Sequence, residues 1–288
     1  MINHAMRNLI STLIALLFST MLFAQKFAKQ IQIGKLKDRE LNEISGIASS
    51  SIKKKSFWTH NDSGDSARIF CINNKGKLKG TVNFNEQLHD AEDIAVGIGM
   101  EKGSYVYLAD IGDNLKWRGK TFIYIFKETD LIKSIGKHHT DNYKKTKLEY
   151  EDGMFNAEAI LIDKIDSLLY IVTKDKQSTN LYFAKIRDLF NRDKVVLNKM
   201  AVLACTNITA GDISKNGDEI LLKNYDSVFY WKRIKGEPIY ETLQRPSTII
   251  PYIKESQGEA ICFANDNTGF YTVSEDKFSP IYFFKRRK

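Results

Sequence analysis

A three-residue phrase recurs five times along the sequence, each time at the start of an apolar stretch typical of a β-strand. Its first two residues are polar, acidic or small, and its third is isoleucine. The copies are Ser45-Gly46-Ile47, Glu92-Asp93-Ile94, Glu158-Ala159-Ile160, Gly211-Asp212-Ile213 and Glu259-Ala260-Ile261. Their first members are separated by 47, 66, 53 and 48 residues. A unit that repeats every 40–50 residues or so indicates a solenoid or a propeller. Because the units contain strand patterns throughout, the spacing favours a β-propeller.

The number of strands per unit predicts how the array closes. The first four units each contain four apolar segments, whereas the last contains three and then the chain stops. Residues 29–36 alternate polar and apolar side chains, as a half-buried strand does, and precede the first unit. We expect this strand to complete the last unit from outside, which leaves no open edge. The sequence therefore predicts an all-β fold, a five-bladed β-propeller closed by its N-terminal strand. A six-bladed arrangement would need a further repeat.

The N-terminal residues 1–24 have the pattern of a signal peptide. A single charge, Arg7, precedes a 15-residue apolar run from Leu9 to Phe23, and the small residue Ala24 follows it. This run is shorter than the roughly 20 residues that a spanning helix needs, although an uncleaved anchor is the alternative. We expect a secreted or periplasmic protein, with residues 25–288 forming one propeller domain and no transmembrane helix in the mature chain.

The cysteine content and the net charge further narrow the class of protein that this sequence predicts. The three cysteines, Cys71, Cys205 and Cys262, are odd in number and lie within apolar strands. They are therefore expected to be buried small hydrophobes and not a disulfide framework. The formal net charge is +8, but the basic residues are spread along the chain and gather on no single element. We expect no nucleic-acid partner.

Three phrase glutamates and one serine would converge in such a fold, because every phrase begins an innermost strand. These residues are Ser45, Glu92, Glu158 and Glu259. Carboxylate and hydroxyl oxygens without histidine or cysteine suit a hard cation, and calcium tolerates flexible oxygen coordination. The sequence thus predicts calcium as the cofactor, on the propeller axis. The alternative is a hydrated channel in which these polar groups bind water and backbone.

The strand starts resemble those of the apyrase family of calcium-activated nucleotidases. The resemblance is carried by Glu43-Ile44-Ser45, by Ala91 to Val96, by Glu158-Ala159 and by Gly258 to Ile261. It implies a five-bladed propeller with axial calcium held by Ser, Glu, Glu, Ser and Glu from successive blades. The fourth-blade position departs from this pattern, and either Thr209 or Asp212 is expected to fill it. The match covers the strand starts alone. The chain also resembles secreted bacterial propellers without an established reaction.

Charged loops between the second and third strands of each unit are expected on the same face as the phrases. The resemblance implies an acidic loop in the first blade, matched by residues 61–65, and paired arginines in the third. Here Lys174 and Lys176 stand in the third blade, and lysine does not bind phosphate through two parallel hydrogen bonds as arginine does. Arg68 and Arg118 could supply charge instead. The expected substrate-binding set is Asp65, Arg68, Asp110, Asp113, Arg118, Lys174, Lys176 and Lys277.

Two functions fit these residues. The first is calcium-dependent hydrolysis of phosphate esters or anhydrides, in which Asp62 and Glu92 are the expected catalytic acids that position water. The second is a non-catalytic module that binds a small anionic molecule, a glycan, a peptide or a partner protein, with a structural axial calcium. The fold alone does not choose between them.

Overall fold

The computed structural model describes residues 26–287, so the expected signal peptide lies outside the described residues. Strands dominate this part of the chain, and consecutive strands form antiparallel groups of four. The first sheet contains β2 (Ile44–Ser49), β3 (Ser56–Asn61), β4 (Arg68–Asn73) and β5 (Leu78–Asn83). The next group contains β6 (Ala91–Gly97), β7 (Tyr105–Asp110), β8 (Thr121–Lys127) and β9 (Lys144–Tyr150).

The remaining strands repeat this arrangement. One group contains β10 (Ala157–Asp163), β11 (Leu168–Thr173), β12 (Thr179–Lys185) and β13 (Lys194–Leu203). Its outer strand pairs in parallel with β9, which merges the two groups into an eight-stranded sheet. Another sheet contains β14 (Ala210–Ile213), β15 (Glu219–Lys223), β16 (Val228–Lys232) and β17 (Thr248–Ile250). The last contains β18 (Gly258–Phe263), β19 (Gly269–Ser274), β20 (Pro280–Lys285) and β1 (Ile31–Lys35).

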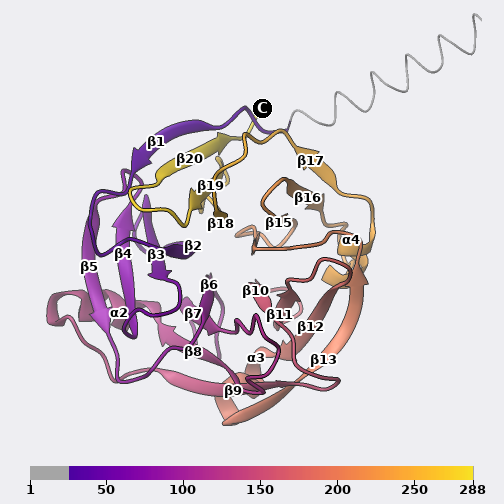
Figure 1. The fold of residues 1–288 in the computed structure, drawn as a ribbon, viewed down its shortest axis with the longest axis horizontal. Coiled ribbons are helices and arrows are strands. Elements are labelled where there is room, and N and C mark those ends of the chain that lie inside the picture. Colours follow the sequence, from indigo (N-terminus) through magenta and orange to yellow (C-terminus); the bar gives the residue numbers. More distant parts are fainter. Residues whose placement is uncertain (1–25, 288) are drawn as a thin grey trace, which may run out of the picture.

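The first strand of each group lies at the centre of the molecule (Figure 1). These inner strands contact one another in the order β2, β6, β10, β14 and β18, and β18 contacts β2. They therefore form a closed ring around one axis, with the other strands of each group extending outward. This arrangement is a β-propeller.

The two ends of the chain meet in one sheet. β1 pairs antiparallel with β20, where Ile31 lies opposite Phe283 and Gln32 opposite Tyr282. The predicted closure of the last sheet by the N-terminal strand is confirmed. The outer edge of β20 is consequently paired, which removes an exposed edge that would favour aggregation.

The hydrophobic core is divided among the interfaces between neighbouring sheets. One cluster joins Tyr107 of β7 to Ile160 of β10, and another joins Trp58 of β3 to Leu108 of β7. Each of these side chains is fully or almost fully buried, because alternate residues of a strand point to opposite faces and both faces of an inner sheet are covered. All three cysteines are free and buried, as predicted.

Short helices lie in three of the connections between strands. The polar insertion after β8 contains α2 (Glu128–Ser134) and the 3₁₀ helix η1 (Ile135–Lys137). The fourth outer strand, expected within residues 238–250, is only β17, because α4 (Ile239–Gln244) occupies the first half. Its buried residues Ile239, Thr242 and Leu243 have helical spacing. The connection between β12 and β13 contains α3 (Ile186–Asn191). Within residues 26–287, no helix is both long and apolar enough to cross a membrane.

Candidate axial cation site

A β-bulge marks the start of four of the five inner strands. In β2, Ile44 pairs with Asn61 and Gly46 with His60, so that Ser45 is the extra residue. Glu92, Glu158 and Glu259 are the corresponding extra residues of β6, β10 and β18. A bulge re-aims the side chain of its extra residue. The backbone thus turns these four polar side chains out of the strand pattern, and all four are at most 6% exposed.

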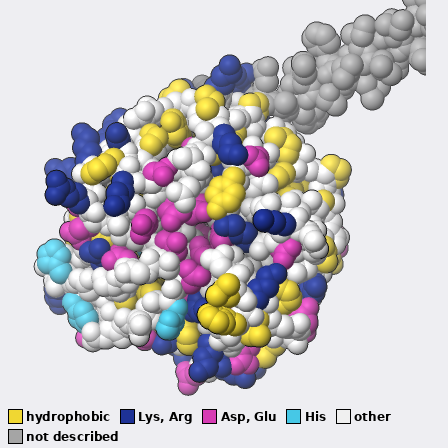
Figure 2. Space-filling view, viewed as in Figure 1, with side chains coloured by type: hydrophobic (Ala, Val, Ile, Leu, Met, Phe, Trp, Pro, Cys, Tyr) yellow, Lys and Arg dark blue, Asp and Glu magenta, His cyan; other side chains and the backbone are white. Residues whose placement is uncertain are grey.

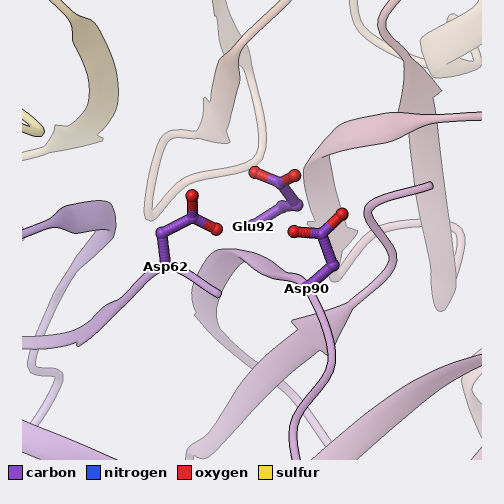
Figure 3. A group of neighbouring side chains, drawn as sticks. All are labelled: Asp62, Asp90 and Glu92. Atoms are coloured by element: carbon purple, nitrogen blue, oxygen red, sulfur yellow. The ribbon is translucent and has the colours of Figure 1, made fainter. Parts of the chain in front are cut away.

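Three carboxylates gather beside the first two of these bulges. Asp62 follows β3, Asp90 precedes β6, and Glu92 is the bulged residue of β6; one oxygen of each lies within 4.8 Å of the others (Figure 3). The Ser45 hydroxyl donates to the Glu92 carbonyl at 3.1 Å. Figure 2 shows acidic side chains gathered at the centre of this face of the molecule. The structure therefore brings Ser45, Glu92 and Asp62 together and adds Asp90.

Space beside these acids depends on Gly112. A Cβ atom at this position would lie 2.4 Å from Oδ2 of Asp90 and 2.4 Å from Oε1 of Glu92. The missing side chain leaves room for the two carboxylates at the axis. In addition, Oδ1 of Asp62 is buried and has no hydrogen-bond partner among the described residues.

The proximity of these acids disfavours their ionisation. Burial, followed by the charges of Glu158, Asp62 and Asp90, raises the pKa of Glu92 well above its usual value. Burial and the neighbouring Asp62 raise the pKa of Asp90 to about 6. Burial and the charge of Glu259 also raise the pKa of Asp62. Carboxylates held together in this way are stabilised by protonation or by a cation between them.

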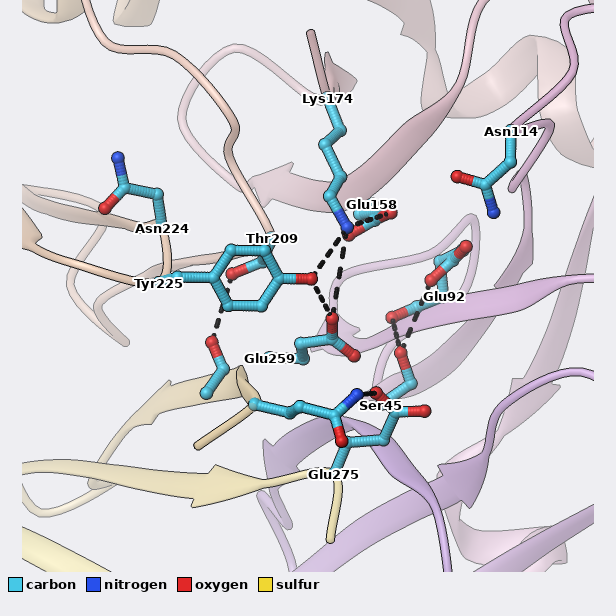
Figure 4. A network of polar contacts seen from close by, with 12 residues as sticks. Ser45, Glu92, Asn114, Glu158, Lys174, Thr209, Asn224, Tyr225, Glu259 and Glu275 are labelled. Carbon is cyan, nitrogen blue, oxygen red and sulfur yellow. Dashed lines mark hydrogen bonds and ion pairs between the residues drawn. The ribbon is translucent and has the colours of Figure 1, made fainter. Parts of the chain in front are cut away.

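The other two ring glutamates are bound by a lysine. Lys174 Nζ lies 2.6 Å from Oε1 of Glu158 and 3.9 Å from Oε1 of Glu259. The Tyr225 hydroxyl accepts from Lys174 at 2.9 Å and donates to Glu259 (Figure 4). Burial opposes the charge on Lys174, but Glu158 raises its pKa. Burial and the adjacent Glu259 raise the pKa of Glu275 to about 9. This half of the ring thus contains a positive charge, whereas no ion pair of the described residues involves Glu92, Asp62 or Asp90.

The fourth inner strand contributes differently from the others. β14 has a regular register from Ala210 to Ile213, without a bulge. The Thr209 hydroxyl, just before it, donates to the carbonyl of Gly258 at 3.1 Å. Asp212 instead accepts from the backbone N–H groups of Ile213 and Phe263. Of the two side chains expected at this position, Thr209 lies with the ring residues, as Figure 4 shows, and Asp212 joins β14 to β18.

Most of the predicted rim residues are bound to one another. Asp65 accepts two hydrogen bonds from Arg68 Nε, at 3.0 and 2.9 Å. Arg118 donates to the buried Asp110 at 2.8 Å, and Asp113 accepts from the backbone of the same loop. Lys176 and Lys277 are exposed and take part in no ion pair within the described part of the chain. Only Lys174 among the predicted substrate-binding residues reaches the axial acids.

Asp90, Tyr225 and Glu275 were not singled out from the sequence. Asp90 lies in the connection before β6, Glu275 lies in the connection after β19, and Tyr225 lies in the turn after β15. The position of Asp90, two residues before Glu92, is the one signal that points to it, because residues two apart in an extended chain project to the same side.

Comparisons with known proteins add little beyond the fold. No protein-family description matches the sequence, and no curated protein is similar to it. Among solved structures, a chain of a nidogen/laminin complex is 11% identical, with a TM-score of 0.48, over 80% of this chain and 72% of that one. The WD40 repeats of RRP9 are 10% identical, with a TM-score of 0.41, over 85% of this chain and 67% of that one. Likeness of this extent identifies neither a ligand nor an activity.

Proposed function

We propose that the chain is a secreted, five-bladed β-propeller that binds one calcium ion on its axis and presents a ligand-binding face around it. The observation that carries this proposal is the approach of Asp62, Asp90 and Glu92 to within 4.8 Å of one another. Oxygen ligands of calcium lie about 2.3–2.6 Å from the ion. Two oxygens bound to one ion are therefore at most about 5 Å apart, so the separations in this donor set are compatible with a shared calcium ion.

The chemistry of the donors also fits. The three side chains offer only oxygen atoms, and the unpartnered Oδ1 of Asp62 adds an acceptor that no protein donor satisfies. Ser45 orients Glu92 through its hydrogen bonds. Glu158, Thr209 and Glu259 complete the ring that the apyrase resemblance implies, with Lys174 balancing the charge of the two glutamates.

Five blades are supported by the ring of inner strands. β2, β6, β10, β14 and β18 each begin a group of four strands, the last completed by β1. The eight-stranded sheet counts as two of these groups, because the pairing of β9 with β13 joins their outer strands. Secretion rests on residues 1–24, which have the pattern of a signal peptide.

A binding role fits the rim better than catalysis does. A phosphate-binding rim needs free cationic side chains, but Arg68 and Arg118 are already paired with Asp65 and Asp110. The proposed ligand classes are therefore a glycan, a peptide and a partner protein as well as a small anion.

Hydrolysis of phosphate esters or anhydrides is the second candidate, favoured by the free oxygen of Asp62. A bound calcium ion would supply positive charge next to a phosphate group. Asp62 Oδ1 has no donor of its own and would accept a proton from an attacking water, while Glu92 would orient that water. Of the predicted cationic residues, Lys174 is the one that pairs with ring glutamates, namely Glu158 and Glu259.

Calorimetric titration of calcium tests the proposal. The protein is compared with Glu92→Gln and Asp90→Asn, and with Glu101→Gln as a control for the loss of one exposed carboxylate far from the ring. We expect one site, weakened about tenfold or more in the first two variants, equivalent to ~1.4 kcal/mol, and unchanged in the control. Absence of calcium binding by the unaltered protein would contradict the proposal.

Release of phosphate from ATP and p-nitrophenyl phosphate, with and without calcium, separates the two functions. Calcium-dependent release that is lost in Asp62→Asn would establish the hydrolase. Calcium binding without release would establish the binding module.

A further inference from the structure

The axial channel has a second mouth at the opposite ends of the inner strands. A cavity of about 250 Å³ lies there, and all five inner strands line it, for example through Ser49 of β2, Val96 of β6 and Ile162 of β10. Asp212 of β14 and Phe263 of β18 line the rest of the cavity wall. The ring acids lie at the starts of these strands and this cavity lies at their ends, so the two sites are separate.

A second cavity widens this mouth toward the first and last sheets. It has a volume of about 380 Å³ and shares Ser49, Ser51, Lys215 and Asn265 with the first cavity. Shared lining residues mean that the two cavities adjoin. The joint space is within the size range of small-molecule sites, and its walls carry hydroxyl and amide groups next to the aromatic rings of Phe57 and Tyr271.

Lysines at this second mouth have no carboxylate partner. Lys54, Lys55, Lys164 and Lys215 line the two cavities and are exposed. None of them takes part in an ion pair among residues 26–287. Elsewhere on the molecule, lysines such as Lys116 and Lys232 are paired with acids. Positive charge is therefore left unbalanced at this mouth.

The acids that line the same cavities are already engaged. Asp212 accepts from two backbone N–H groups, at 2.8 and 2.7 Å. Asp266 accepts from the backbone and the hydroxyl of Thr268. Neither carboxylate forms an ion pair with a lysine within residues 26–287, so all four lysines are open to an external anion.

The loop that carries two of these lysines is held in place. Buried Glu128 accepts from the Ser50 hydroxyl at 2.6 Å and from the backbone N–H of Ser51 at 3.1 Å. Asn265 Nδ2 donates to the carbonyl of Ser49 at 3.2 Å from the facing turn. A loop fixed before binding loses little conformational entropy when a ligand arrives.

We propose that this second mouth binds a small molecule that carries two or more negative charges. Lys164 and Lys215 would contact its anionic groups over the axis, and Lys54 and Lys55 those extending toward the first sheet. The serine hydroxyls and Asn265 provide hydrogen bonds to polar groups between the charges. Phosphate and carboxylate groups share this chemistry. The site does not depend on the proposed axial calcium.

Isothermal titration with fructose 1,6-bisphosphate and with succinate tests the site and separates the two anion types. The titrations use about 0.15 M salt, at which long-range charge effects are largely screened. The test variant is the double substitution Lys164→Met and Lys215→Met. The matched control is Lys185→Met and Lys235→Met, which removes the same charge from two exposed lysines that line neither cavity and form no ion pair among residues 26–287. Circular dichroism confirms that both variants are folded.

We expect at least one probe to bind. Its affinity should fall about tenfold or more in the test variant, ~1.4 kcal/mol, and stay unchanged in the control. The probe that binds identifies the anionic group. Equal losses in both variants would show a general charge effect and overturn the proposal, as would the absence of binding by the unaltered protein. Because the axial acids are intact in all these proteins, none of these outcomes bears on calcium.

Discussion

At the scale of single residues, Gly112 controls whether the axial acids can approach one another. The atoms that a Cβ would meet at this position are the far ends of the Asp90 and Glu92 side chains, not backbone. Such side chains can rotate away. A methyl group here is consequently expected to displace the two carboxylates while the strands around them stay in place.

Gly112→Ala should therefore weaken calcium binding about tenfold or more, ~1.4 kcal/mol, with a small change in thermal stability. Calorimetry measures the first quantity and a melting curve the second. Gly136→Ala is the matched control, because a Cβ at Gly136 would meet no atom within 4 Å. Unchanged calcium affinity in Gly112→Ala would place the ion away from Asp90 and Glu92.

At the scale of secondary-structure elements, buried aspartates join inner strands that are not paired with each other. Asp93 of β6 accepts from the backbone N–H of Ile160 in β10 at 2.8 Å and from that of Ile94 at 2.8 Å. Asp212 does the same between β14 and β18. An inner strand has an unpaired edge toward the axis, and these carboxylates satisfy N–H groups that would otherwise be buried without a partner.

Asp93→Asn should lower the free energy of unfolding by about 1–3 kcal/mol. The amide has one acceptor oxygen for two backbone donors, and its NH₂ group would face an N–H group. Chemical denaturation measures the loss, and Asp141→Asn, at an exposed position, should have almost no effect. Equal stability of Asp93→Asn and the unaltered protein would show that water satisfies Ile160 as well as the carboxylate does.

The strands were predictable from the sequence because their side chains alternate along short apolar runs. The alternating residues 29–36, for example, contain β1 (Ile31–Lys35). The phrases also identified Ser45, Glu92, Glu158 and Glu259 as inward-facing residues. The fourth copy of the phrase did not identify a ring residue, because β14 lacks the extra residue that the other four inner strands contain. A bulge is a mismatch between two strands, so one strand's sequence does not reveal it.

Side-chain contacts between residues of different loops could not be predicted from the sequence. Glu158 and Lys174 lie at the paired ends of β10 and β11, whereas Tyr225 reaches Lys174 from the neighbouring sheet. This second contact depends on how adjacent sheets are oriented about the axis. Arg118 likewise was expected to supply charge at the rim, but its guanidinium donates to Asp110 of its own loop. Residue spacing along the chain does not report these contacts.

At the scale of the whole molecule, one carboxylate connects both ends of the described chain to the fourth sheet. Glu219 of β15 lies 3.0 Å from Lys26 and accepts from Arg286 at 2.9 and 2.6 Å. Phe27 packs edge-on against Tyr230 and Phe270 beside this cluster. The closing sheet is thus attached to its neighbour through charged as well as apolar contacts.

Glu219 should also make the attachment of the closing sheet to the fourth sheet sensitive to acid. Burial opposes its ionisation, but hydrogen bonds from Arg286, Tyr230 and Lys26 lower its pKa to about 2. An unfolded chain titrates glutamate near pH ~4.3. Because the folded pKa is the lower one, this stabilisation is fully present above about pH 4.3 and is lost as the pH falls toward 2.

Glu219→Gln is therefore expected to lower the free energy of unfolding by about 2 kcal/mol at pH 7. This loss corresponds to a decrease in Tm of roughly 4–8 °C. The difference from the unaltered protein should shrink between about pH 4.3 and 2. Hydrogen exchange should quicken in β1 and β20, which the cluster anchors. Glu149→Gln is the control, because its pairs with Lys147 and Lys194 lie at the surface and such pairs contribute little. A pH-independent difference would mean that Glu219 acts through packing, whereas equal losses in both variants would remove any special role for this carboxylate in closing the ring.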